Sequence, residues 1–154
     1  MKWKPSGNVS ESAGTLLPRL AEKYFASGRK AAADGKKSAK ELHRFRIETK
    51  RFRYTLELFR PVYGAKMDHY LQSLRELQGA LGKVSDYQTI QTLLPDGDPL
   101  RASVQRSLRR KIKELRKDWQ EFDSNGELKR WKTYLANGTR KGPAPRARAA
   151  SSND

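Results

Sequence analysis

The chain has 154 residues, enough for one domain with a hydrophobic core, and its 33 Lys and Arg against 17 Asp and Glu give a formal net charge of +16. So large a positive charge favours a polyanionic partner. With no cysteine, disulfides and thiolate chemistry are excluded, and His43 and His69 are too few and too far apart for a His-rich metal site. No apolar run is long enough to span a membrane and no secretory signal is visible, so we expect a cytoplasmic, soluble protein with no membrane partner.

Helical periodicity dominates the chain, and no sustained strand alternation occurs. Gly35, the Pro61 to Gly64 region and the Pro95 to Pro99 turn break the pattern. Gly79 and Gly82 are expected to permit close helix approach or to mark a helix end. The pattern predicts four long helices over residues 15–33 (with Thr15 or Ser12 as N-cap), 38–59, 66–83 and 100–122, the last resuming over 127–135, and a short helix over 85–94.

Amphipathic helices with short connections predict an all-α fold, an antiparallel four-helix bundle. We expect residues 1–14 to form a flexible N-terminal segment, 15–136 the bundle and 137–154 a disordered basic tail. The apolar residues recur at spacings of three and four, which is typical of a core-facing stripe. The expected core positions include Leu42, Phe45, Thr49, Phe52, Leu56 and Phe59, then Met67, Tyr70, Leu74, Leu77 and Leu81, and finally Val104, Leu108, Ile112, Leu115, Trp119 and Phe122.

Positive charge is concentrated in particular segments. Residues 37–63 carry 8 basic and 3 acidic side chains and residues 100–136 carry 11 and 5, whereas residues 64–99 carry 3 and 5. A bundle built from these segments should have one electropositive region. A solvated helix face normally mixes charges of both signs, so rows of like charge favour a bound anion over a merely solvated surface.

Helical spacing aligns three such rows. The row on the second helix lies beside the apolar stripe, whereas Arg44 and Arg51 point elsewhere on that helix. The candidate anion-binding residues are His43, Arg46, Lys50 and Arg53 on the second helix, Arg19, Lys23 and Lys30 on the first, and Arg109, Lys113 and Arg116 on the fourth.

The segment from Leu42 to Tyr54 contains His-x-x-Arg-x-x-x-Lys-Arg-x-Arg-Tyr, beginning at His43. It is followed by Glu57-Leu58-Phe59, Tyr63-Gly64, Leu74-Arg75-Glu76-Leu77-Gln78 and Leu81-Gly82. This series resembles the CHAD family, the conserved-histidine α-helical domains, most strongly over residues 42–94 and more weakly over the first and fourth helices.

The resemblance implies a helical bundle that binds inorganic polyphosphate without catalysis and without a cofactor. His43 matches the family histidine, and Arg46, Lys50, Arg51 and Arg53 match its basic positions, although its direction makes Arg51 a weaker candidate. A typical member resembles two four-helix bundles, and this chain resembles only the C-terminal half. The resemblance therefore implies a homodimer that completes the anion site, with polyphosphate granules as the expected location; a monomer with half a groove is the alternative.

Two other functions remain open at this stage. Catalysis on phosphates is disfavoured because there is no Gly-x-x-x-x-Gly-Lys-Ser/Thr loop, and Asp96 and Asp98 lack the rest of a metal-binding loop. A nucleic-acid-binding protein that uses the same basic surface is the stronger alternative, because net charge alone does not distinguish two polyanions.

Overall fold

The computed structural model describes residues 9–33 and 38–139. Those residues form helices and turns and contain no strand, which confirms the all-α class. The five helices are α1 (Val9–Ala32), α2 (Ser38–Tyr63), α3 (Met67–Leu93), α4 (Pro99–Phe122) and α5 (Glu127–Asn137).

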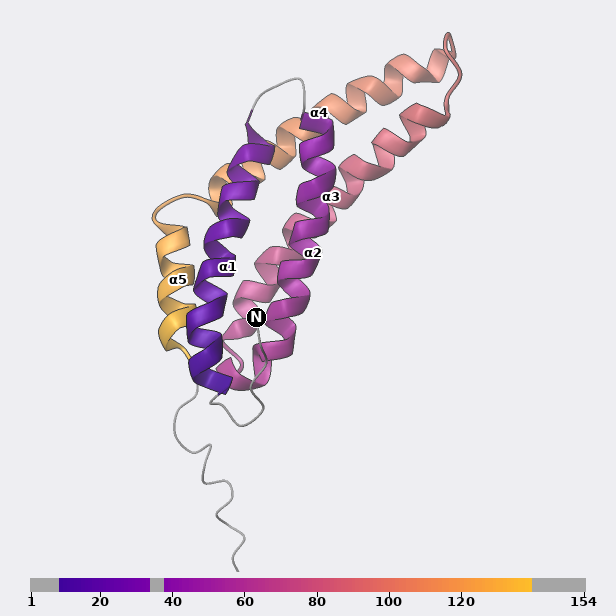
Figure 1. Ribbon diagram of the computed structural model, residues 1–154. Coiled ribbons are helices and arrows are strands. Elements are labelled where there is room, and N and C mark those ends of the chain that lie inside the picture. Colours follow the sequence, from indigo (N-terminus) through magenta and orange to yellow (C-terminus); the bar gives the residue numbers. More distant parts are fainter. Residues whose placement is uncertain (1–8, 34–37, 140–154) are drawn as a thin grey trace, which may run out of the picture.

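The helices pack side by side in a ring around the core. α2 packs between α1 and α3, α3 packs against α4, and α5 packs against α1 (Figure 1). The C-terminal part of α1 meets α4, where Gly28 faces Trp119, and its N-terminal part meets α5, where Gly14 faces Ala136. α4 and α5 thus share the place that is predicted for one interrupted helix. Figure 1 also shows the α3–α4 hairpin extending past the ends of α1 and α2.

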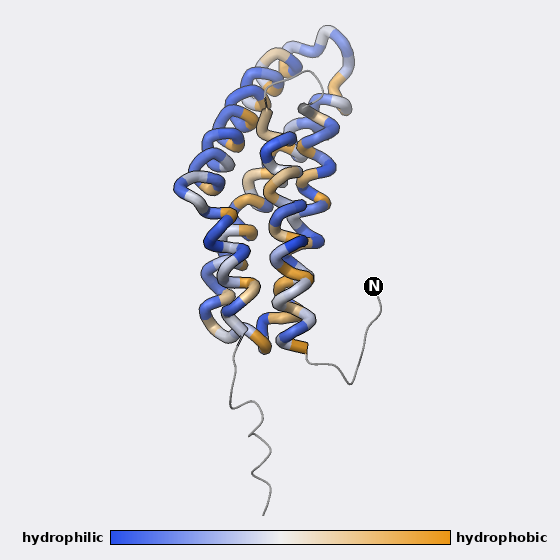
Figure 2. Tube along the Cα trace, turned by 60° about the vertical axis from the view of Figure 1, so that its left-hand side comes forward, coloured by the Kyte–Doolittle hydropathy of each residue, from blue (hydrophilic) through white to orange (hydrophobic). Residues whose placement is uncertain are grey.

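The core is rich in aromatic rings, to which all five helices contribute. Trp119 packs against Tyr24, Phe25 and Phe45, and Trp131 packs against Phe25. Large apolar side chains of this kind supply most of the free energy that holds such helices together. Hydrophobic positions gather between the helices, while α4 is mostly hydrophilic along its length (Figure 2).

One hydrogen-bonded pair lies inside this core. The Thr49 hydroxyl donates to the Phe45 carbonyl oxygen at 2.8 Å, and the Tyr24 hydroxyl lies 2.8 Å from the Thr49 oxygen. Because the single Thr49 proton is already committed, Tyr24 is the donor to Thr49. The buried hydroxyls are therefore satisfied between α1 and α2.

The first helix begins at Val9 rather than near Thr15. Ala13 and Leu17 are completely buried, so core packing continues toward the N-terminus beyond the predicted start. Thr15 is not an N-cap, since its hydroxyl donates to the Glu11 carbonyl oxygen inside the helix. Within the two segments predicted to be flexible, residues 9–14 belong to α1 and Asn137 belongs to α5. Residues 1–8 and 140–154 lie outside the described residues.

The predicted break between residues 83 and 85 is also wrong, because α3 is continuous to Leu93. Leu81 and Val84 are both buried, and their packing carries the helix through this point. Gly79 and Gly82 neither end the helix nor permit close approach, since a Cβ at either position would meet nothing within 4 Å.

A tight turn joins α3 to α4. Gly97 has a φ of +85°, a conformation that favours glycine, and the Asp98 carboxylate accepts a hydrogen bond of 2.8 Å from the Leu100 N–H as the N-cap of α4. No helix within the described ranges is both long enough and apolar enough to cross a membrane.

Candidate anion-binding site

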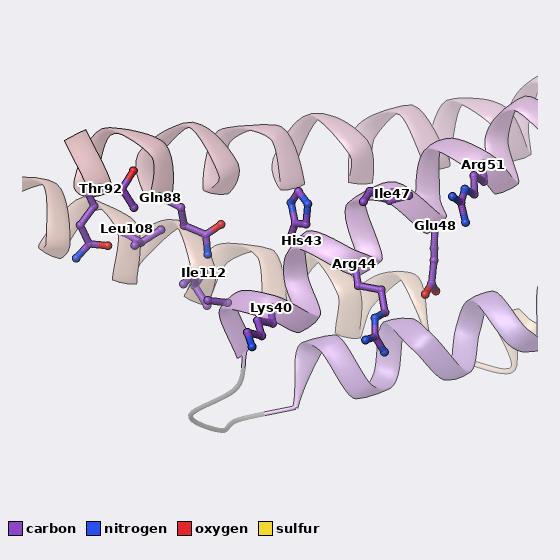
Figure 3. A pocket seen from close by; sticks show the side chains of 12 residues that line it. Lys40, His43, Arg44, Ile47, Glu48, Arg51, Gln88, Thr92, Leu108 and Ile112 are labelled. Carbon is purple, nitrogen blue, oxygen red and sulfur yellow. The ribbon is translucent and has the colours of Figure 1, made fainter. Parts of the chain in front are cut away.

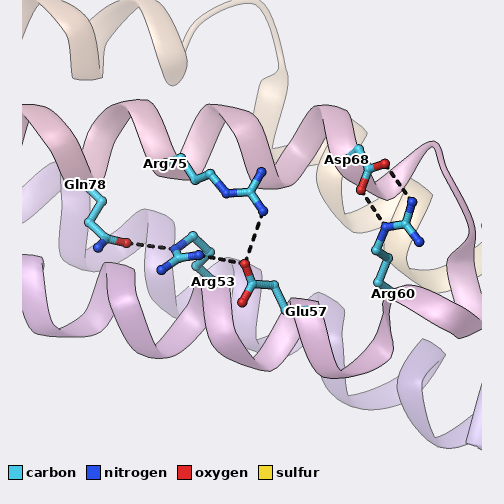
Figure 4. Close-up of polar contacts among 6 residues, drawn as sticks. All are labelled: Arg53, Glu57, Arg60, Asp68, Arg75 and Gln78. Carbon is cyan, nitrogen blue, oxygen red and sulfur yellow. Dashed lines mark hydrogen bonds and ion pairs between the residues drawn. The ribbon is translucent and has the colours of Figure 1, made fainter.

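Two arginines in the C-terminal half of α2, Arg53 and Arg60, form ion pairs within the protein. Arg53 donates from Nε to Gln78 at 2.8 Å and from a terminal nitrogen to Glu57 at 2.6 Å (Figure 4). Arg75 of α3 donates to the same Glu57 oxygen at 3.3 Å. The Arg53 side chain is only 14% exposed, so this predicted anion-binding residue is held within the α2–α3 interface.

A second ion pair lies further along the same interface. Arg60 donates two hydrogen bonds to Asp68, at 2.6 and 2.8 Å (Figure 4). This fork holds the pKa of the Asp68 carboxyl below its ordinary value, because the hydrogen bonds and the positive charge favour the ionised form. Arg53 and Arg60 therefore already have anionic partners.

The stretch of α2 from Lys40 to Arg51 is different, because four of its basic residues line an open hollow. This α2 hollow has a volume of about 870 Å³ and lies where α2 meets the extended α3–α4 hairpin (Figure 3). Its basic residues are Lys40, His43, Arg44 and Arg51. The remaining lining residues are Ala39, Ile47 and Glu48 of α2, Gln88, Gln91 and Thr92 of α3, and Leu108 and Ile112 of α4.

The charge of the α2 hollow is not balanced internally. Within the described part of the chain, no carboxylate lies within 4.0 Å of the cationic groups of Lys40, His43, Arg44 or Arg51. Glu48 is the one acidic residue among the described lining residues. Two glutamine side chains supply neutral donors on the opposite wall. The hollow can therefore accept an anion through both charge and hydrogen bonds.

Arg46 and Lys50 lie beside the hollow, on the flank of α2. Both are half-buried. The Arg46 Nε is buried and has no hydrogen-bond partner among the described residues. A buried N–H without a hydrogen-bond partner costs free energy. An external acceptor that reached the Arg46 Nε after a small movement of the side chain would remove this cost.

The other two predicted rows do not join the hollow. On α1, Arg19 and Lys23 are exposed, and the Lys30 Nζ lies 3.9 Å from the Glu41 Oε1. On α4, Arg109 and Lys113 are exposed and Arg116 is half-buried. Of the predicted set, His43 alone lines the α2 hollow, among the residues that the structure describes.

Lys40, Arg44 and the wall of α3 are not among the residues predicted from the sequence, and Arg51 is only a weaker candidate there. Arg44 and Arg51 point away from the core stripe, yet the hollow opens on this outer side of α2. Gln88 and Gln91 belong to the part of α3 beyond the falsely predicted break. The shared helix face of Lys40, Arg44 and Arg51 was the available signal.

The described residues contain no group of three or more His, Cys, Asp or Glu side chains arranged to hold a metal ion. A family model described as the CHAD domain matches residues 2–95, which include α1, α2 and α3 and end in the turn before α4. Comparison with curated proteins and comparison with solved structures each found no match.

Proposed function

The chain belongs to the CHAD family, which is associated in general with polyphosphate binding, and on this premise we propose that it binds inorganic polyphosphate without catalysing a reaction on it. The observation that supports this function best is the unbalanced positive charge of the α2 hollow. Cations that lack an internal carboxylate within ion-pair distance are those that gain most from an external polyanion.

The residue types suit a flexible chain of phosphates. Arginine offers forked donors that can hold two phosphate oxygens, and lysine offers a mobile point charge. A phosphate polymer presents repeated oxygens and no bases, so the protein needs a basic surface without base-reading contacts. Arg44, Arg51 and Lys40 meet this requirement around His43.

The proposed site extends beyond the hollow, both along α2 and onto α1 and α4. Arg46 and Lys50 continue it along α2. The rows on α1 and α4 are outer contacts for a longer polymer, while Arg53 acts through its hold on Glu57 and Gln78. The outer contacts are Arg19, Lys23, Lys30, Arg109, Lys113 and Arg116.

A homodimer is part of the proposal. The chain resembles one bundle of a two-bundle arrangement, so two copies with polyphosphate between them would restore a site with two basic walls. Light scattering with and without polyphosphate tests this. A monomer under both conditions contradicts the two-chain site and leaves single-chain binding in place.

A titration with polyphosphate of defined length, set against duplex DNA at equal phosphate concentration, tests the main proposal. We expect polyphosphate to displace DNA. We also expect the amount of polyphosphate to stay constant during incubation, since the protein is proposed not to hydrolyse it. DNA that displaces polyphosphate instead would favour the nucleic-acid alternative. A fluorescent fusion that collects at cytoplasmic polyphosphate granules would agree with the expected location.

A further inference from the structure

The outer face of α2 carries three exposed apolar side chains in one line. Ile47 is 37% exposed, Tyr54 51% and Leu58 79%. At about 100° per residue they fall within an arc of about 40°, and at 1.5 Å per residue they span about 16 Å of helix. Single exposed apolar residues are ordinary on a protein surface, but an aligned set marks an interaction face. We call Ile47, Tyr54 and Leu58 the outer stripe.

The outer stripe continues into the α2 hollow. Ile47 belongs to both, and Leu108 and Ile112 of α4 extend the apolar surface on the other wall. The Arg53 guanidinium lies 4.6 Å from the centre of the Tyr54 ring, yet half of Tyr54 stays exposed. The apolar surface that includes Leu108 and Ile112 is therefore longer than the outer stripe alone. It remains accessible to solvent at Tyr54 and Leu58.

Unbalanced cations border the outer stripe on both sides. Helical geometry places His43 and Lys50 along one edge and Arg44 and Arg51 along the other. Within the described residues, none of these four has a carboxylate within 4.0 Å. In Figure 3, His43 lies on the side of α2 nearer α3 and Arg44 on the side nearer α1. The surface is thus an apolar line between two basic lines.

Polyphosphate does not explain the apolar part of this surface, because the polymer has no apolar atoms. A second copy without an intervening polyanion would bring like charges together along both edges. A helix with an apolar stripe and acidic flanks complements both features. We propose that the outer stripe and its basic borders bind an acidic amphipathic helix of a partner protein, in competition with polyphosphate.

The dimensions fit this occupant. The stripe spans about three helical turns, which matches apolar anchors spaced at three, four and seven residues on a partner helix. Glutamates beside those anchors would meet Arg44 and Arg51 on one side and Lys50 on the other. The competition rests on the proposed function, because polyphosphate and the acidic helix would need the same cations. Binding of the helix by itself does not depend on the proposed function.

Fluorescence anisotropy with two synthetic peptides tests the proposal. The probe peptide has about three heptads, with leucine at the a and d positions and glutamate at most others. The control peptide has the same composition with its leucines dispersed around the helix. We expect the probe to bind about tenfold tighter than the control, and polyphosphate to displace it.

Variants separate apolar recognition from charge. Tyr54→Gln with Leu58→Gln should abolish the difference between the two peptides, and circular dichroism checks that the helices remain. Leu93→Gln is the matched control, because Leu93 is 76% exposed but lies at the far end of α3, and it should change nothing. Both peptides binding equally, or Leu93→Gln weakening the probe as much as the double variant, would overturn the proposal.

Two further results keep this inference distinct from the proposed function. If the unliganded protein is a dimer that the double variant converts to a monomer, a second copy covers the stripe and the partner-helix proposal is wrong. If the probe binds as expected but polyphosphate neither binds nor displaces it, the proposed function fails and helix binding stands, without the competition.

Discussion

Trp119 of α4 lies directly over Gly28 of α1. A Cβ built on Gly28 would overlap the Trp119 indole, with Cη2 as the nearest atom. The indole cannot easily move aside, because it packs against Phe25, Phe45 and Phe122. The absence of a side chain at position 28 is therefore what lets the middle of the bundle close around this tryptophan.

Gly28→Ala should destabilise the protein by about 1–3 kcal/mol, because the added methyl group overpacks a rigid aromatic cluster. The matched control is Gly79→Ala on α3, where nothing lies within 4 Å of the new Cβ. That variant should stabilise the protein by up to about 1 kcal/mol, since alanine favours helix more than glycine does. Urea denaturation measures both. Two changes of the same sign would contradict the packing around Trp119.

Stability should fall at alkaline pH. Burial raises the pKa of Tyr63 and of Tyr134 to about 12, and burial also raises the pKa of Tyr24. A tyrosine in the unfolded chain ionises near pH 10, so the fold favours the neutral form. This contribution is fully present below about pH 10 and is lost as the pH rises from there through about 12.

Near-ultraviolet absorbance of tyrosinate and far-ultraviolet circular dichroism should therefore change together in that range. Tyr63 donates a hydrogen bond of 2.6 Å to the Leu135 carbonyl oxygen, so Tyr63→Phe should cost about 1 kcal/mol at neutral pH. The same variant should make the alkaline loss of stability shallower, because one raised pKa is removed. An alkaline transition as steep as that of the parent protein would show that Tyr63 does not contribute.

The helices and the core could be predicted from the sequence because they depend on local periodicity. Phe45, Thr49, Phe52 and Leu56 are buried on α2 as their spacing requires. The break predicted near Lys83 was wrong because nearby glycines suggested a helix end, while the packing of buried neighbours outweighs glycine's modest cost.

The candidate site was harder to predict because it depends on where neighbouring helices stop. The helical wheel places Arg53 beside the core, and that is also where α3 approaches and offers Gln78 as a partner. Arg51 points away from the core, and that side lines the open hollow that α2 forms with the α3–α4 hairpin. The directions of the Arg51 and Arg53 side chains could be predicted from the sequence. Whether each arginine pairs with another residue of the protein or stays open to a ligand could not.

Arg51→Gln and Arg53→Gln remove the same charge from α2 and should differ in effect. Arg51→Gln should weaken polyphosphate binding with little change in stability, because Arg51 is exposed in the α2 hollow. Arg53→Gln should cost about 1–2 kcal/mol of stability, since it removes charge-assisted hydrogen bonds at the α2–α3 interface. Calorimetric titration and urea denaturation of both variants provide the comparison. Equal losses of affinity would mean that the attraction is diffuse.

Polyphosphate binding should weaken steeply with salt, because each neutralised phosphate releases condensed cations. By analogy with nucleic acids, the logarithm of affinity should fall linearly with the logarithm of salt concentration, by about 0.7–0.9 per phosphate contacted. Arg51→Gln should reduce this slope by about one contact. Leu56→Ala is the contrasting variant, because Leu56 is completely buried in the core. It should cost about 2–5 kcal/mol of stability and leave the salt slope of the folded protein unchanged. A slope that Arg51→Gln leaves unaltered would remove Arg51 from the contacts that hold the polymer.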